Sequence, residues 1–380
     1  MMQDNSSPTS SWILIARIIL KALVLFILIN LIYVAINPLP LLGKLTLYNS
    51  LLPGRPRLPF GEEPQIAYNF SIKSFEAMIA SHELEGEKIP GDEYRILVLG
   101  DSGTWGTLLM PEQMLSGLVN SAGIGACDDR PVKAYNLAYP TLSLTKDLML
   151  LEEGLRYQPE LVLWLVTLDS FPQNKQLENP LVASSPDRAK RLLESAGISI
   201  PGAEKIFIKP NLWQRTIIGQ RRALADLVRY QLYGLMWAAT GVDQVYTLDY
   251  QPAQRDLAPD ETYNGWTPPE LPVDQLAFSV LAAGVDLAGP VPVIIINEPI
   301  LISSGENSDI RYNYYYPHWA YDQYRQHLSN FCAENGLPCY DFWDLVPESE
   351  FTNTAIHLTP TGEVMLAEQV IRLLTDQVCK

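Results

Sequence analysis

The chain has 380 residues, of which 47% are apolar, enough to bury a sizeable core in one large α/β domain or two modest ones. Its formal net charge is −16 at pH 7, and its lysines and arginines do not cluster along the sequence. Because phosphate backbones are bound by clustered basic side chains, this composition excludes nucleic acid as a partner.

The first marked feature is an apolar run, Trp12 to Ile36, that follows a polar stretch over 1–11. A helix of about 25 residues, at roughly 1.5 Å per residue, crosses the roughly 30 Å of hydrocarbon in a bilayer with some tilt. No small-residue cleavage site follows, so the run predicts a membrane anchor over 12–37 in place of a removed signal peptide. A buried core helix is the alternative.

The basic residues around this run bear on its orientation. Arg17 and Lys21 lie in its first half and favour a cytoplasmic tail over 1–11. We therefore expect a single-pass protein of the cell membrane with its large domain outside the cytoplasm. Three basic residues after the run pull weakly the other way: Lys44, Arg55 and Arg57.

Residues 38–92 are rich in proline and carry no strong periodicity, which predicts a stalk or a segment that wraps around the domain. At most one helix is expected there, around Lys73–Leu84. The prolines of its first half are Pro38, Pro40, Pro53, Pro56, Pro59 and Pro64.

From residue 93 to 380, short apolar runs alternate with helical patterns, as in a parallel sheet covered by helices on both faces. The predicted strands are Arg95–Gly100, Val132–Ala138, Leu161–Thr167, Val291–Asn297 and Pro338–Phe342. The predicted helices between or after them include Leu144–Arg156, Trp319–Asn335 and Thr361–Val378. The last helix has a suitable start, because Thr359 or Thr361 can cap it and Pro360 fits a first turn.

About a hundred residues, 172–286, separate the third and fourth strands. Two helical stretches lie in them, Asp187–Ala196 and Leu212–Thr240. Insertions after the carboxyl ends of strands cover the crevice where ligands bind in open α/β sheets, so this segment predicts a helical cap. The apolar side chains of Leu224–Thr240 leave two alternatives open, core packing and contact with a bilayer surface.

Two segments far apart in the sequence carry residues suited to nucleophilic catalysis. Ser102 follows the first strand in Gly100-Asp101-Ser102-Gly103, where glycines permit a tight turn at the mouth of the crevice. His357 stands in a loop directly before the last helix. A serine hydroxyl is a poor nucleophile unless a base takes its proton, so a serine and a histidine at one sheet edge predict a catalytic pair.

These segments resemble the SGNH (GDSL-type) hydrolase superfamily. Gly100–Ser102 after an apolar strand resembles its first block, and Ala355–Gly362 resembles its last, in which the histidine precedes a Leu-x-Pro-x-Gly helix entry. Asn136–Thr141 is similar to the second block, and Pro159–Trp164 to the strand that leads into the third. The resemblance covers residues 94–380.

The resemblance implies a flavodoxin-like three-layer α/β/α sandwich and ester chemistry, with no cofactor. Ser102 would be the nucleophile, with its own N–H as one oxyanion donor, and His357 the general base. Where the family has an acidic residue three positions before the histidine, this chain has Thr354, with Asn353 beside it. Asn353 is our candidate for orienting His357, and Asp341 or Asp344 is the alternative.

Asp101, Ala138, Thr141 and Asp169 are the candidate substrate-binding residues. Ala138 and Thr141 are nearest to the glycine that donates to the oxyanion in the second block. The third block has an asparagine in the family, and this chain has Asp169 nearby instead. An ionised carboxylate would repel an oxyanion, so we expect Asp169 to turn away or to make a structural hydrogen bond.

Other polar and aromatic groups near the carboxyl edge of the predicted sheet leave alternatives open. Asn297-Glu298-Pro299 ends the fourth strand and is expected at the pocket. The tyrosines at 312, 314, 315 and 316, with His318 and Trp319, form either an aromatic platform for sugar rings or packing around a loop. The four cysteines lack metal-site spacing, and Cys332 and Cys339 can close a small disulfide loop in an extracytoplasmic domain.

Together these features predict a membrane-tethered serine esterase or O-acyltransferase for acyl esters, including those of envelope polysaccharides. The alternative is a binding or assembly protein that has kept the fold and lost the chemistry. A nucleotide-binding domain is disfavoured, because Gly100–Gly106 lacks the glycine spacing of a phosphate loop.

Overall fold

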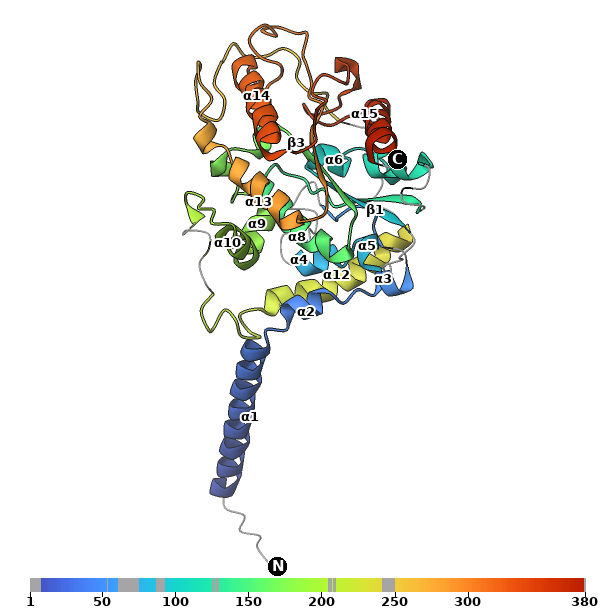
Figure 1. Cartoon of the computed structure of the whole chain (residues 1–380). Helices are drawn as coiled ribbons and strands as arrows, with labels where there is room; N and C mark the ends of the chain where they lie inside the picture. The colour runs from blue at the N-terminus through green and yellow to red at the C-terminus, as the bar shows by residue number, and fades with distance from the viewer. Residues whose placement is uncertain are drawn as a thin grey trace, which may run out of the picture.

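The computed structural model describes residues 8–52, 54–60, 75–86, 93–124, 127, 130–203, 207, 210–240 and 250–378. Figure 1 shows a long isolated helix at one end and a sheet wrapped in helices at the other. The structural statements that follow concern these residues.

The core is the five-stranded parallel sheet that the sequence predicts, and the structure gives its strand order as β2-β1-β3-β4-β5. Its strands are β1 (Tyr94–Leu99), β2 (Val132–Asn136), β3 (Leu161–Val166), β4 (Val293–Asn297) and β5 (Cys339–Asp341). Strands β1, β3 and β4 are buried along their whole length, which explains why they are apolar apart from Arg95 and Asn297. In the register, Leu97 pairs with both Tyr135 and Val162.

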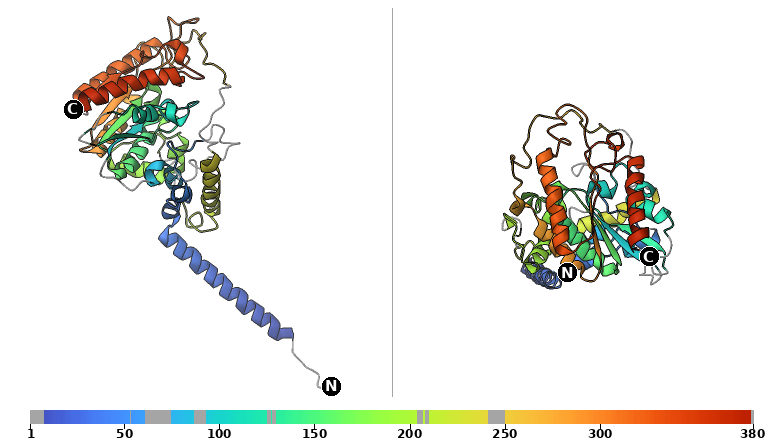
Figure 2. Two further views of the ribbon diagram at one scale, coloured as in Figure 1. Left: turned by 90° about the vertical axis from the view of Figure 1, so that its right-hand side faces the viewer. Right: turned by 45° about the horizontal axis from the view of Figure 1, so that its top comes forward.

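Helices cover both faces of the sheet, so the predicted three layers are confirmed. One face packs against α8 (Leu144–Gly154), α13 (Phe278–Ala288) and α14 (His318–Asn335). The other packs against α7 (Leu115–Ser121) and α15 (Pro360–Leu373). The right-hand view of Figure 2 shows the sheet between the orange α14 and the red α15.

Capping residues fix the starts of two of these helices. The Ser143 hydroxyl accepts from the N–H of Lys146 at the start of α8. At the start of α15, the Thr359 hydroxyl accepts from the N–H of Gly362 at 3.1 Å, and Pro360 occupies the first turn. The loop before α15, which carries His357, is therefore held at the carboxyl edge of the sheet.

The helix α1 (Pro8–Ile36) is almost wholly exposed along its apolar length. The stretch Trp12–Ile36 is long and apolar enough to cross a membrane, a test that a signal sequence also passes. Short helices α2 (Leu39–Gly43) and α3 (Tyr48–Leu51) follow it. The boundaries proposed for a tail, an anchor and a stalk remain predictions.

The helix expected around Lys73–Leu84 is interrupted. In its described part, α4 (Phe75–Ile79) and α5 (Glu83–Gly86) are separate, with His82 buried between them. The His82 ring bonds to the carbonyl of Asn136 through Nε2 at 3.0 Å and accepts from the N–H of Leu84 through Nδ1. This anchorage of the turn to the end of β2 ends α4 early.

The described helices of the long insertion do not lie over the crevice as the predicted cap would. Its helices α9 (Pro180–Ser184) and α10 (Pro186–Ser195) pack on α8, and α12 (Arg221–Thr240) packs on α2 and α3. Leu227 and Tyr230 of α12 are buried in that contact. Helical structure expected from Leu212 starts only at Arg221. The amphipathic pattern was correct for α12, but its buried side faces the N-terminal helices rather than the crevice.

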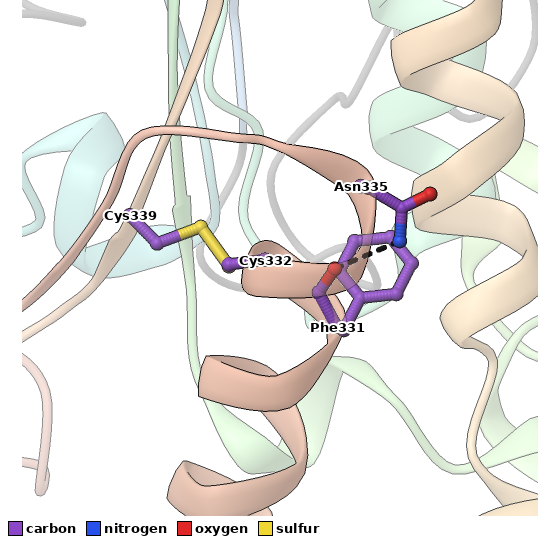
Figure 3. The surroundings of a disulfide bond; sticks show 4 residues. All are labelled: Phe331, Cys332, Asn335 and Cys339. Atoms are coloured by element: carbon purple, nitrogen blue, oxygen red, sulfur yellow. Dashed lines mark hydrogen bonds between the residues drawn. A yellow bond between two sulfur atoms is a disulfide. The ribbon is translucent and has the colours of Figure 1, made fainter.

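A disulfide joins Cys332, near the end of α14, to Cys339, the first residue of β5 (Figure 3). The bridge predicted for an extracytoplasmic domain is therefore present in the structure. It lies at the amino end of β5, away from the edge that carries the candidate catalytic residues.

The remaining regular elements are short. Besides α6, described below, they are the 3-10 helices η2 (Pro111–Gln113), η3 (Leu155–Tyr157), η4 (Leu168–Ser170), η5 (Gln173–Lys175), η6 (Val273–Gln275) and η7 (Glu348–Glu350), and the π-helical η8 (Leu374–Val378).

Candidate active site

Ser102 opens the four-residue helix α6 (Ser102–Trp105), and two residues, Gly100 and Asp101, separate it from the end of β1. The Asp101 carboxylate caps this helix by accepting from the N–H of Gly103 at 2.8 Å. A Cβ at Gly103 would lie 2.7 Å from the carbonyl oxygen of Ile356. Only glycine therefore lets the segment that carries the histidine approach the serine turn so closely.

The structure brings Ser102 and His357 together, although 255 residues separate them. Nε2 of His357 lies 2.8 Å from Oγ of Ser102. The loop around His357 is closed by a hydrogen bond from the N–H of Thr352 to the His357 carbonyl at 2.8 Å and by a bridge between Phe351 and Leu358. The imidazole is thus held within hydrogen-bonding reach of the hydroxyl.

Asn353 meets the far nitrogen of the imidazole. Its Oδ1 lies 2.7 Å from Nδ1 of His357. An amide oxygen only accepts hydrogen bonds, so this contact places the proton on Nδ1 and leaves the Nε2 lone pair for the Ser102 hydroxyl. Thr354 is turned to its own backbone, where its hydroxyl accepts from the N–H groups of Ile356 and His357.

The two acidic alternatives do not orient His357. Asp341 accepts from Asn297 Nδ2 at 2.8 Å and pairs with Arg325. Asp344 makes no hydrogen bond to His357 in the described part of the chain. The partner of the imidazole is therefore an amide.

Burial sets the charge state of His357. The residue is only 7% exposed, and burial lowers its pKa from 6.5 to about 4. The imidazole is consequently neutral near pH 7 and free to take a proton. An amide partner is consistent with this state, because it orients the ring without favouring the imidazolium form.

A pocket of about 390 Å³ opens beside this pair. Its walls combine aromatic, apolar and small polar side chains. They are Phe60, Ser102, Trp105, Thr107, Pro140, Thr141, Leu142, Tyr315, Asn353, Thr354, Ile356 and His357. No described residue of the insertion 172–286 is among them, which corrects its expected role as a cap. A larger hollow between α8, α10 and α13 contains neither Ser102 nor His357.

Among the candidate substrate-binding residues, Thr141 lines this pocket. Its φ is +80°, a left-handed backbone conformation that residues other than glycine rarely adopt. Its hydroxyl accepts from the amide of Asn179, which holds it in place. Among the described residues, no hydrogen bond is found for the backbone N–H of Thr141 or of Ser102, and both residues face the same pocket.

Ala138 does not have the role expected of it. Its N–H donates to Oδ1 of Asn136 at 3.0 Å, and the residue is fully buried. A donor already paired inside the protein is not available to an oxyanion. Of the two candidate donors, Thr141 therefore remains, and its positive φ is a feature that the sequence did not reveal.

Asp101 and Asp169 also lie outside the pocket lining. Asp169 accepts from Lys175 at 2.5 Å and from the Tyr263 hydroxyl at 3.1 Å, the structural hydrogen bonding that its charge suggested. Asp101 is buried beneath the serine turn and shares a hydrogen bond with Glu298. Their contribution to a substrate site is therefore indirect.

Glu298, the buried partner of Asp101, was expected at the pocket from the sequence but does not line it. Burial and the neighbouring charge of Asp101 raise its pKa well above the ordinary value. Glu298 is therefore protonated and donates to the Asp101 carboxylate, which also accepts from Gly103. This pair fixes the start of α6 from below.

Lys146 is a further buried group that the sequence did not single out. Its ammonium donates to the carbonyls of Gly100 at 2.6 Å and Tyr139 at 2.7 Å, and pairs with Asp147 at 2.8 Å. The two carbonyls belong to the turns after β1 and β2. One cation thus ties the turn of Ser102 to the turn of Thr141.

Of the aromatic cluster over 312–319, only Tyr315 lines the pocket. Tyr312 stacks on His318 with ring centroids 3.9 Å apart, and Tyr316 is fully buried. Most of the cluster is therefore packing around a loop, the second of the two alternatives. Asn297 binds Asp341 and does not line the pocket.

Phe60 and Trp105 are wall residues that the sequence did not reveal. Phe60 comes from the proline-rich segment and meets Trp105 and Tyr139 edge to face at centroid distances of 6.1 and 5.4 Å. The Trp105 indole donates to the carbonyl of Leu58 at 2.7 Å, and Arg57 donates to that of Gly106. Residues 54–60 therefore wrap the domain and complete the pocket.

Within the described ranges, no group of three or more His, Cys, Asp and Glu residues is placed to hold a metal ion. The chemistry available at this rim comes from a neutral imidazole, a hydroxyl and two backbone N–H groups.

No family model matches the chain, and no curated protein matches it. It is similar to solved structures. One is a lipolytic protein of the G-D-S-L family from Veillonella parvula, at 11% identity and a TM-score of 0.36 over 74% of this chain and 98% of that one. Another is the lipase/acylhydrolase from Enterococcus faecalis, at 16% identity and a TM-score of 0.34 over 75% and 98%.

A third similar structure is Est24, a carbohydrate acetylesterase from Sinorhizobium meliloti, at 10% identity and a TM-score of 0.36 over 75% of this chain and 99% of that one. These proteins are of the kind that the sequence blocks resemble. At TM-scores below 0.5, the similarities carry no weight for the chemistry of this chain, which depends on its own residues.

Proposed function

We propose that this chain is a serine hydrolase for acyl esters that works through Ser102, His357 and Asn353. The observation that carries the proposal is the 2.8 Å contact between Nε2 of His357 and Oγ of Ser102. This is the geometry that general-base activation of a hydroxyl requires.

In the acylation step, Oγ of Ser102 attacks the ester carbonyl carbon as its proton passes to Nε2 of His357. The carbonyl π electrons move to oxygen, and the resulting oxyanion accepts from the N–H groups of Ser102 and Thr141. Collapse of this intermediate breaks the bond to the alcohol oxygen, which leaves with the proton from His357. Removing one such donor typically costs about 10²–10³ in rate.

In the second step, an acceptor hydroxyl attacks the carbonyl carbon of the acyl-Ser102 ester while its proton passes to Nε2 of His357. The bond between the acyl carbon and Oγ of Ser102 then breaks, and Ser102 takes the proton back from His357. Water as the acceptor gives hydrolysis, and a sugar hydroxyl gives acyl transfer. The substrate class that we propose is an acylated glycan or a related ester of the cell envelope. The aromatic walls Phe60 and Tyr315 beside the pair suit the apolar face of a sugar ring or an acyl chain.

We further propose that α1 anchors the chain in the cell membrane with the domain outside the cytoplasm. The length and apolarity of Trp12–Ile36 support the anchor. The disulfide between Cys332 and Cys339 supports an oxidising compartment. Labelling of intact cells with a membrane-impermeant amine reagent tests this orientation, and an unlabelled domain contradicts it.

The experiment that tests the enzyme uses the full chain in detergent or vesicles. We expect a fluorophosphonate probe to label Ser102 and p-nitrophenyl acetate to be hydrolysed. Ser102→Ala should abolish labelling and reduce kcat about 10³-fold or more, whereas Ser121→Ala, at an exposed serine of α7, should change neither. Equal turnover by the wild type and Ser102→Ala would refute the proposal.

A second candidate is a binding or assembly protein with impaired chemistry. The observation that favours it is the amide at position 353, which cannot neutralise the imidazolium that forms during catalysis. This alternative predicts a folded chain that binds an acylated polysaccharide, with Ser102 left unlabelled by the probe.

A further inference from the structure

Exposed apolar side chains are concentrated in two segments of the domain, 39–52 and 210–240. Outside α1, the described chain has thirteen large apolar side chains that are exposed, and ten of them lie in these two segments. They are Leu41, Leu45, Leu47, Leu51, Leu212, Trp213, Val228, Leu232, Tyr233 and Met236. We call these two segments together the membrane-proximal face. A soluble surface rarely gathers so much apolar area without a partner.

The helix α12 has two apolar sides, one packed against other described helices and one exposed. Leu227 and Tyr230 pack in a cluster with Ala77 of α4 and with α2, while Val228 and Leu232 are 63% and 64% exposed. The Gln231 side chain fixes the arrangement, because its Oε1 accepts from the N–H of Leu47 at 2.7 Å and its Nε2 donates to the carbonyl of Leu45. The exposed side is therefore a stable surface.

This face is joined directly to the end of α1. The N–H of Ile217 donates to Oδ1 of Asn30 at 3.0 Å, and Arg215 donates to the carbonyl of Val34 at 3.1 Å. Asn30 and Val34 are buried in this contact, at 7% and 8% exposed, whereas most side chains of α1 from Trp12 onward are exposed. Figures 1 and 2 show α12 lying across the end of the domain where α1 leaves it.

The charge of the face differs from that of the whole protein. Its two segments contain five basic residues and one acidic residue, Asp226, in a chain of net charge −16. The basic residues are Lys44, Arg215, Arg221, Arg222 and Arg229. Apolar side chains next to arginines are the composition of a helix that lies in the interface of a membrane with anionic lipids.

We propose that the membrane-proximal face rests on the bilayer that α1 crosses, with its apolar side chains in the boundary between headgroups and acyl chains. Trp213 and Tyr233 then occupy the interfacial level that aromatic residues prefer, and the arginines meet anionic headgroups. This inference rests on the anchor part of the proposed function and is independent of the ester chemistry.

The experiment places the full chain in vesicles of phosphatidylcholine and phosphatidylglycerol that contain a phospholipid with a photoreactive diazirine in its acyl chain. After irradiation, tryptic peptides are analysed for lipid adducts. Adducts on residues 22–36 of peptide 22–44 report α1, and peptides 223–229 and 230–255 report α12. Peptides 256–311 and 326–372 contain the exposed Leu287 and Val364 away from the face and serve as controls.

We expect α12 peptides to carry at least about fivefold more adduct than the two control peptides. Leu232→Glu with Met236→Glu should reduce α12 labelling severalfold and leave peptide 22–44 unchanged. The matched pair Leu287→Glu with Val364→Glu should leave both unchanged. Fluorophosphonate labelling of Ser102, or a circular dichroism spectrum like that of the wild type if the chain lacks this chemistry, verifies that each variant is folded.

Each outcome decides a different point. A labelled α1 with unlabelled α12 in the wild type overturns the inference while the anchor stands. An unlabelled α1 overturns the anchor as well. A photoreactive p-benzoyl-phenylalanine at position Leu232 that forms adducts with a protein, either a second copy or another chain, and not with lipid also overturns it. Lipid adducts at that position support it.

Discussion

The rim around Ser102 and the membrane-proximal face are built in opposite ways. At the rim, buried polar groups pair across long stretches of sequence, as in the contacts of His357 with Ser102 and of Lys146 with Gly100 and Tyr139. At the face, side chains such as Leu232 are left in the open. The comparison teaches that two different features point to function. Buried polar groups that are paired across the fold indicate a chemical site, and exposed apolar side chains indicate a surface for attachment.

The strongest way to test the rim as a chemical site is to remove its base. His357→Ala should lower kcat for p-nitrophenyl acetate by about 10³–10⁴, because the serine then keeps its proton. The control is His327→Ala, on the half-buried side of α14, which should retain full turnover. Comparable turnover in both variants would show that the imidazole at 357 takes no part.

A smaller effect is expected at the orienting amide. Asn353→Ala should reduce kcat/KM by about 10–100-fold, since the correct tautomer is no longer favoured. In the wild type, kcat/KM should fall only as pH drops through about 4, where the buried His357 takes up a proton.

The variant Asn353→Asp tests the contact between residue 353 and His357 through the pKa of the imidazole. A carboxylate beside Nδ1 favours the protonated ring and raises the pKa of His357. The acid limb of the kcat/KM profile should therefore move to higher pH. A limb that stays near pH 4 in this variant would show that residue 353 does not contact the ring in solution.

The buried carboxyl group of Glu363 should make the free energy of unfolding depend on pH. Burial raises its pKa from 4.5 to about 8, while it accepts from the N–H of Leu115 at 2.8 Å. Because the unfolded chain loses this proton near pH 4.5 and the folded chain only near 8, this residue's contribution is full below pH 4.5 and is lost as pH rises to about 8.

The corresponding expectation is a decline of about 1.4 kcal/mol per pH unit in the free energy of unfolding from this group, within that window. Glu363→Gln, which cannot ionise, should flatten the decline when unfolding is followed in denaturant between pH 5 and 8. The exposed Glu368→Gln on the same helix is the matched control and should leave the slope unchanged.

The smallest effect is expected for the disulfide, which lies away from the rim. Cys332→Ala with Cys339→Ala opens a loop with a sequence separation of 7, and should cost about 2 kcal/mol in the free energy of unfolding. Because Cys339 begins β5 at the end opposite the rim, kcat should not change. A loss of turnover in the folded variant would contradict this separation of the two ends.

The sheet and most of its helices could be predicted because buried parallel strands read as short apolar runs between helical patterns. The meeting of Ser102 and His357 was predictable for a related reason, since parallel strands bring their carboxyl ends to one edge. Both inferences depend on local patterns and on a rule that applies to every sheet of this type.

What remained out of reach depends on contacts between distant segments. The pattern of α12 indicates an apolar side but not which surface it meets, so a cap was expected where Leu227 and Tyr230 in fact pack against α2 and α4. Phe60 lies in a proline-rich stretch without periodicity, and only its contact with Tyr139 identifies it as a pocket wall. The positive φ of Thr141 is likewise invisible in its residue type.

The hydrogen bonds from Ile217 and Arg215 to the last turns of α1 have a mechanical consequence. A domain joined to a membrane helix by a flexible linker can take many orientations and heights above the bilayer, and the linker length sets its reach. Here these hydrogen bonds fix the junction between α1 and the domain. The helices α6 and α15 lie in the half of the domain away from α1 (Figure 1). If α1 is inserted as proposed, these contacts keep Ser102 at a constant height above the lipid, and the proposed substrate has to extend to that height.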